Sequence, residues 1–243
     1  MKAFDHVEKL SRRLGEIKGA AWNSDSAVCN RFPECGDSLR ARLVWVPSFV
    51  VGAAAATASA AAVALLLYSG EGMLRSLTLI IAVELVAFGV GLASPPESGH
   101  WPVVVEALRR RWLTTLLTFL AASVFTVAWT FGDGFGADGR SQALGLAMLG
   151  GLPLYACGRL LAGISTVATA VGRSSPGAFA SLGAALGVLL TGYSGLSRLG
   201  APSLLLVVLV FLSGAALMQG SILGEVPVMT GGPEEAESGV EDA

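Results

Sequence analysis

Two ionisable side chains lie inside long apolar runs of this chain, and their types could do chemistry there. Glu84 lies near the middle of the second apolar run, and Arg159 lies in the fourth. A charged side chain at the centre of a bilayer costs about 2.5–3.5 kcal/mol on insertion scales, so such residues are functional candidates by default. We expect Glu84 and Arg159 to pair across a helix bundle, because either charge alone would be uncompensated in hydrocarbon.

Two interpretations of these residues remain open. In the functional one, Glu84 binds a proton or a cation, and Arg159 is its partner or an anion ligand. In the structural one, the pair sets the register of two helices, or the long Arg159 side chain reaches the cytoplasmic interface.

The surrounding composition places both residues in a membrane. The 243-residue chain is 53% apolar and only 14% charged, and its mean hydropathy is +0.66. Because a crossing needs about 20 apolar residues, we predict an all-α, polytopic membrane protein with about six transmembrane helices. The predicted spans are residues 44–68, 74–93, 112–131, 142–172, 174–193 and 203–223.

The fourth run is too long for one straight crossing at about 1.5 Å per residue. We expect Gly150, Gly151 and Pro153 to kink or break it. The fifth run begins at Ser174, Ser175 and Pro176, which is typical of a capped helix with proline in its first turn.

The distribution of Lys and Arg predicts the orientation. With six spans, the N-terminal segment, the predicted loop with residues 109–111, and Arg173 hold twelve basic residues on one side. The other side holds only Arg75, Arg140 and Arg198. Since positive loops face the cytoplasm, both termini should be cytoplasmic, in a bacterial-type inner membrane.

Three regions follow from these patterns. Residues 1–43 begin with a short amphipathic helix over 4–18, followed by a polar connector; residues 44–223 form the helical bundle; and residues 224–243 are an acidic, disordered cytoplasmic tail. The amphipathic helix would lie on the cytoplasmic leaflet or a partner, or pack on the protein's own cytoplasmic face. We expect the N-terminus to be retained, because no apolar stretch follows its first basic residues.

Small residues are the other recurrent signal. Gly183 and Gly187 are spaced by four in the fifth run, which matches the small-xxx-small pattern of close helix contact. We expect packing within the bundle, with dimerisation as the alternative.

Catalytic and metal patterns are weak. Residues 192–195 form a Gly-x-Ser-Gly string like that of rhomboid proteases, but neither His6 nor His100 follows the serine in a later span. Cys29 and Cys35 lack the tighter spacing and the further ligands of a zinc site. Phosphate-binding and dinucleotide motifs are absent from the sequence. We therefore predict no catalytic residue, metal, cofactor or nucleic-acid partner.

The order of glycines and prolines in the second half carries a family resemblance. The residues concerned are Gly150-Gly151-Leu152-Pro153-Leu154, Gly158-Arg159-Leu160-Leu161, residues 180–192, and Leu199-Gly200-Ala201-Pro202. This pattern resembles the transmembrane region of membrane-embedded spermidine-synthase-like proteins, which is itself similar to half of a major facilitator transporter. The resemblance covers roughly 70 residues. It implies about six helices, with Arg159 at the position of a basic residue in the fourth helix.

This chain departs from that family after its last span. Such synthases carry a soluble catalytic domain there, whereas only an acidic tail follows here, so no aminopropyl-transfer residue can be carried over. The sequence also shows no duplicated second bundle of the kind found in full-length facilitators. We therefore expect a non-enzymatic scaffold or accessory subunit that binds a partner membrane subunit. The alternative is a small-solute transporter that acts as a homodimer through Glu84 and Arg159.

Overall fold

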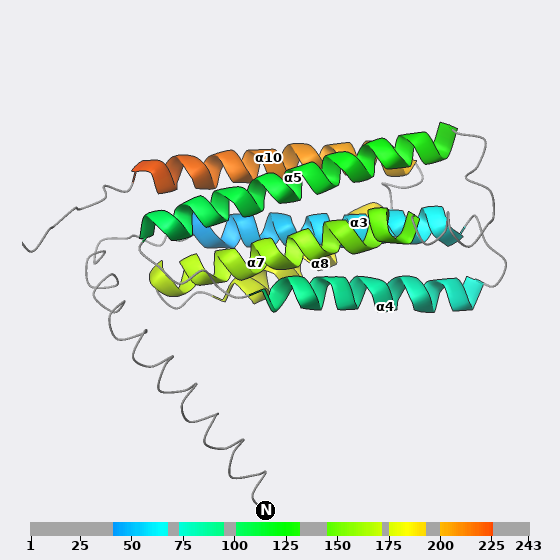
Figure 1. Ribbon diagram of the computed structural model, residues 1–243, viewed down its shortest axis with the longest axis horizontal. Coiled ribbons are helices and arrows are strands. Elements are labelled where there is room, and N and C mark those ends of the chain that lie inside the picture. Colours follow the sequence, from blue (N-terminus) through cyan, green and yellow to red (C-terminus); the bar gives the residue numbers. More distant parts are fainter. Residues whose placement is uncertain are drawn as a thin grey trace, which may run out of the picture.

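The described part of the chain is almost entirely helical. The computed structural model describes residues 41–67, 73–94, 101–131, 145–171, 175–192 and 200–225, and these ranges contain no strand. Six α-helices run side by side along one direction (Figure 1). They are α3 (Val46–Leu67), α4 (Met73–Leu92), α5 (Trp101–Phe131), α7 (Leu152–Val171), α8 (Pro176–Leu190) and α10 (Gly200–Glu225). The predicted all-helical membrane fold is confirmed.

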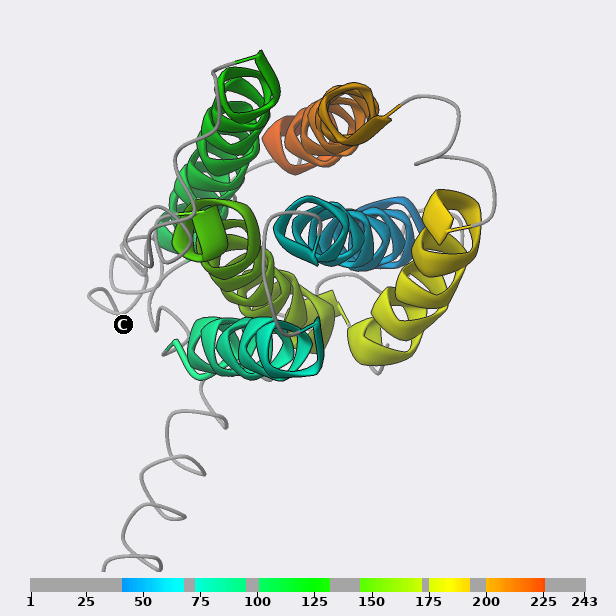
Figure 2. The same ribbon diagram turned by 90° about the vertical axis from the view of Figure 1, so that its right-hand side faces the viewer.

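The helices differ in length. Four are long and apolar enough to cross a membrane, over Arg42–Leu65, Pro102–Trp129, Ala147–Thr169 and Gly200–Leu223. The other two, Leu77–Leu92 and Pro176–Leu190, are apolar but shorter. When the bundle is viewed along its axis, α3 lies in the middle, and α7, α8 and α10 lie around it (Figure 2).

Two helices extend beyond their predicted spans. Helix α5 begins at Trp101, eleven residues before the predicted span, so Arg109, Arg110 and Arg111 lie within a helix and not in a loop. Helix α10 continues to Glu225, into the predicted tail. The predicted amphipathic helix over 4–18, the connector up to residue 40, and the tail from residue 226 lie outside the described residues.

Prolines mark where the helices begin. Each of five helices has proline among its first three residues, where a missing N–H costs no internal hydrogen bond. These prolines are Pro47, Pro102, Pro153, Pro176 and Pro202.

Two of these prolines follow a π-helical segment. Segment η1 (Ala41–Trp45) precedes Pro47, and η2 (Leu146–Gly151) precedes Pro153. A proline ring within a continuing helix clashes with the carbonyl four residues earlier, and the wider π turn relieves this clash. Consequently the long fourth run is neither broken nor a plain α-helix: it stays helical from residue 145 to 171 through η2.

The two halves of the bundle repeat one set of contacts. Helix α3 packs on α8 and α10, and α7 packs on α4 and α5. Helices α3 and α7 touch each other, and so do α5 and α10. Exchanging α3, α4 and α5 for α7, α8 and α10 therefore returns the same pattern. Because successive helices cross the bundle in alternating directions (Figure 1), a unit of three helices recurs upside down, which is an inverted repeat.

A short sequence pattern accompanies this repeat. Pro47, Phe49 and Gly52 have the same spacing at the start of α3 as Pro153, Tyr155 and Gly158 at the start of α7. The counterpart glycines make counterpart contacts. A Cβ on Gly52 would overlap the Ala180 carbonyl of α8, and a Cβ on Gly158 would overlap the Phe88 carbonyl of α4.

The reciprocal contacts also use glycine. A Cβ on Gly183 of α8 would overlap the Phe49 carbonyl, and a Cβ on Gly91 of α4 would overlap the Tyr155 carbonyl. One turn after Gly183, a Cβ on Gly187 would lie 2.8 Å from the carbonyl oxygen of Ala53. Gly183 and Gly187 thus lie where α8 meets α3 within one chain, and backbone touches backbone there.

Replacing Gly183 by alanine should destabilise the bundle. The added methyl group meets the rigid backbone of α3, so the two helices must move apart, at an expected cost of about 1–3 kcal/mol. Gly214→Ala is the matched control, because Gly214 is also mid-helix and has open space around its Cβ position. Thermal unfolding in detergent should show a lower midpoint for Gly183→Ala only. Equal midpoints for the two variants would contradict the close contact.

Candidate functional site

Glu84 is a buried carboxyl at the junction of three elements. Its side chain on α4 is only 5% exposed. Its Oε2 lies 2.6 Å from the hydroxyl of Ser59 on α3. Its Oε1 is buried and has no hydrogen-bond partner among the described residues. A Cβ on Gly150 of η2 would lie 3.3 Å from Glu84 Oε1, so the absent side chain of Gly150 leaves the carboxyl its space.

The expected pair of Glu84 and Arg159 is not formed. The ion pair in the described part of the chain joins Glu106 and Arg110, and the Glu84 carboxyl is hydrogen-bonded to Ser59 instead. The backbone of Arg159 lies beside Gly91, which is about 10 Å farther along α4 than Glu84. The backbones of Glu84 and Arg159 are therefore at different levels along the bundle, and the predicted ion pair between them is not formed among the described residues.

Arg159 takes part in a second polar junction through its backbone. The guanidinium Nη1 of Arg111 on α5 donates to the Arg159 carbonyl at 2.8 Å. Arg111 is 4% exposed, unlike its exposed neighbours Arg109 and Arg110. A cavity of about 10 Å³ adjoins this guanidinium, which is enough space for one water molecule. This hydrogen bond joins α5 to α7 and places the positively charged guanidinium of Arg111 between them.

A third junction joins three elements through one amide. Gln219 of α10 is fully buried. Its Oε1 accepts the indole N–H of Trp112 at 2.6 Å, and its Nε2 donates to the carbonyl of Leu43 at 2.6 Å. In a regular α-helix the N–H four residues later would serve that carbonyl, but residue 47 is proline and has none. Gln219 thus supplies a donor to a carbonyl that Pro47 cannot serve.

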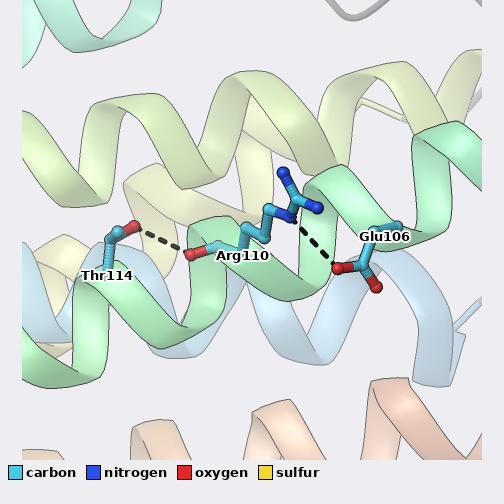
Figure 3. Close-up of polar contacts among 3 residues, drawn as sticks. All are labelled: Glu106, Arg110 and Thr114. Atoms are coloured by element: carbon cyan, nitrogen blue, oxygen red, sulfur yellow. Dashed lines mark hydrogen bonds and ion pairs between the residues drawn. The ribbon is translucent and has the colours of Figure 1, made fainter.

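The exposed polar contacts of α5 differ from these junctions. Figure 3 shows Arg110 donating to Glu106 at 3.1 Å, while the Thr114 hydroxyl donates to the Arg110 carbonyl at 3.0 Å. Both charged side chains are more than half exposed. Surface pairs of this kind contribute little to stability, commonly less than about 1 kcal/mol.

The sequence candidates have different outcomes. Glu84 and Arg159 lie in the described helices, but apart from one another. His6, His100, Cys29, Cys35 and Ser194 lie outside the described residues. Within the described residues, no group of three or more His, Cys, Asp or Glu side chains could hold a metal ion.

Sequence reasoning missed Gln219 and Arg111. Gln219 is an uncharged polar residue inside the sixth apolar run, and a search for ionisable residues passes over it. Arg111 is the last of three consecutive arginines, and helical geometry turns it inward while its two neighbours face outward. A search for any hydrogen-bonding side chain within a span would have found Gln219.

Comparisons with protein-family models, curated proteins and solved structures find no match to this chain.

Replacing Gln219 by leucine should destabilise the fold. The Trp112 N–H and the Leu43 carbonyl would remain buried without a partner, and each unsatisfied group costs about 1–3 kcal/mol. Ser221→Ala is the control, since that exposed hydroxyl bonds only to its own helix. The measurement is the thermal midpoint in detergent. If Gln219→Leu unfolds at the midpoint of Ser221→Ala, the junction contributes nothing.

Proposed function

We propose that this protein is a non-enzymatic membrane scaffold or accessory subunit built as a half-transporter-like bundle. The observation that carries this proposal is that buried polar side chains of the protein bond to other elements of the same bundle. Buried side chains on α3, α5 and α10 bond to neighbouring helices, as the Trp112, Gln219 and Leu43 junction shows. Helix backbones meet directly at glycines. Such contacts favour a bundle that keeps one shape.

The half-transporter character rests on the arrangement of the helices. Two inverted units of three helices are the arrangement found within each half of major facilitator transporters. This supports the proposed kinship with the transmembrane region of spermidine-synthase-like proteins. In that proposal, the bundle supplies a membrane platform, and a partner membrane subunit supplies the chemistry or the transport pathway.

A homodimeric transporter is the second candidate function. The buried Glu84 carboxyl with one unpartnered oxygen favours it, because intramembrane carboxyls commonly mark ion pathways. In such a dimer the second copy would take the place of the missing half, and Glu84 and Arg159 would act at separate depths.

The two candidates predict different oligomeric states. We expect a scaffold to be monomeric when purified alone in lipid nanodiscs, and native mass spectrometry measures this directly. A stable symmetric dimer would favour the transporter.

Cys157 reports whether the bundle opens. This thiol is fully buried in α7, so a bundle that keeps one shape should protect it from maleimide. The Cys29→Ser, Cys35→Ser double variant makes Cys157 the single thiol of the chain. We expect no labelling in nanodiscs until the protein is denatured, and complete labelling afterwards. Labelling of the folded protein would show an opening motion and contradict the scaffold.

We also propose that both termini face the cytoplasm of a bacterial-type cell, in its inner membrane. The charge distribution supports this orientation. Green fluorescent protein fused after Ala243 should fluoresce, and alkaline phosphatase inserted between residues 132 and 144 should be active, since that segment follows α5 on the opposite side. The reverse pair of results would invert the topology.

A further inference from the structure

The surroundings of Glu84 contain no counter-charge in the described chain. Helices α3 and α8 and segment η2 hold no Asp, Glu, Lys, Arg or His. Helix α7 carries Tyr155, Cys157 and Arg159, and the last lies beside Gly91, about 10 Å away along α4. Arg75 is on α4 itself, more than two helical turns from Glu84.

An ionised carboxylate fits this site poorly. A buried charge without a partner of opposite sign is strongly unfavourable, and the donor that the described residues provide is the Ser59 hydroxyl. The second oxygen would be a buried anionic atom without any hydrogen bond. A neutral carboxylic acid needs less from its surroundings, because one oxygen then becomes a donor and the other a weaker, neutral acceptor.

The geometry around Ser59 suits the neutral acid. At 2.6 Å the contact between Ser59 Oγ and Glu84 Oε2 is short enough for either oxygen to be the donor. When Glu84 carries the proton, its Oε2–H donates to Ser59, and the serine hydroxyl can turn to a carbonyl of its own helix. Every O–H group at the junction then has an acceptor.

We propose that Glu84 is a proton-binding site inside the membrane, occupied near neutral pH and held by Ser59 of α3 beside Gly150 of η2. The site does not depend on the scaffold role. Release of the proton would place a carboxylate at the junction of α3, α4 and η2. Segments of π-helix such as η2 often occur at functional positions. Alkaline pH is therefore expected to loosen this junction.

A hydrophobic carbodiimide tests the site directly. Dicyclohexylcarbodiimide reacts with a protonated carboxylic acid in apolar surroundings: the acid oxygen bonds to the central carbon, and the proton moves to a nitrogen. The adduct rearranges to a stable N-acylurea without loss of any atom, and mass spectrometry of peptides locates it. The full-length protein in nanodiscs is the sample, so no variant has to fold for this measurement.

We expect Glu84 to be labelled near neutral pH, and labelling to decline as the pH rises and the proton leaves. Glu106 is the internal control, because this exposed carboxyl is paired with Arg110. It should react at least about tenfold less, because an exposed carboxyl paired with a guanidinium lacks the apolar surroundings in which this reagent acts. In Glu84→Gln, the α4 peptide should carry no adduct, and the infrared band of a neutral carboxylic acid should disappear.

Two results would overturn the proposal. One is an unlabelled Glu84 at neutral pH under conditions in which added hydrophobic carboxylic acids react. The other is loss of Glu84 labelling in sodium chloride but not in choline chloride at the same pH, which would make the site one for a metal cation. Neither result bears on the oligomeric state or on Cys157, so the scaffold proposal is tested separately.

Discussion

Direct contact between helix backbones is the constraint on which this bundle depends. Lipid tails are as apolar as leucine, so helices in a membrane gain little from burying apolar side chains against each other. They gain from close approach. Gly52 and Gly183 allow it between α3 and α8, and Gly91 and Gly158 allow it between α4 and α7. These four positions let α8 pack closely on α3, and α4 pack closely on α7.

The repeat explains why these contacts occur in pairs. Helices α3 and α7 are counterparts, and each begins after a π-helical segment with a proline at its second residue. The π-helical turn comes about two turns of helix before the glycine that meets the neighbouring helix. Proline, an aromatic residue and glycine thus form one local motif, which occurs once in each half of the bundle. The two motifs, in opposite orientation, make corresponding contacts in the two halves of the bundle.

Much of this fold was predictable from the sequence, because the length and apolar character of the runs are read directly against the bilayer. The helices, the proline in the first turn of α8 and the unusual fourth run follow from such patterns. The inverted repeat was not predictable, because its signature is three residues within otherwise apolar sequence. The start of α5 was also missed, since Arg109 and Arg110 are typical of a loop, yet the helix continues through them and leaves both side chains exposed.

At the candidate site, prediction from the sequence fails for a different reason. The sequence alone indicates that the charge of Glu84 needs a partner, but it does not show which residue provides one. An arginine in another span is the obvious partner, and the structure places its backbone at a different depth. The carboxyl instead meets a serine, supplied by the stretch of α3 that is rich in small residues. A hydroxyl can share a hydrogen bond with a carboxyl but cannot cancel its charge. The simplest way for this site to become neutral is therefore to hold a proton, so the Glu84 side chain, buried where helices pack, is also able to respond to pH.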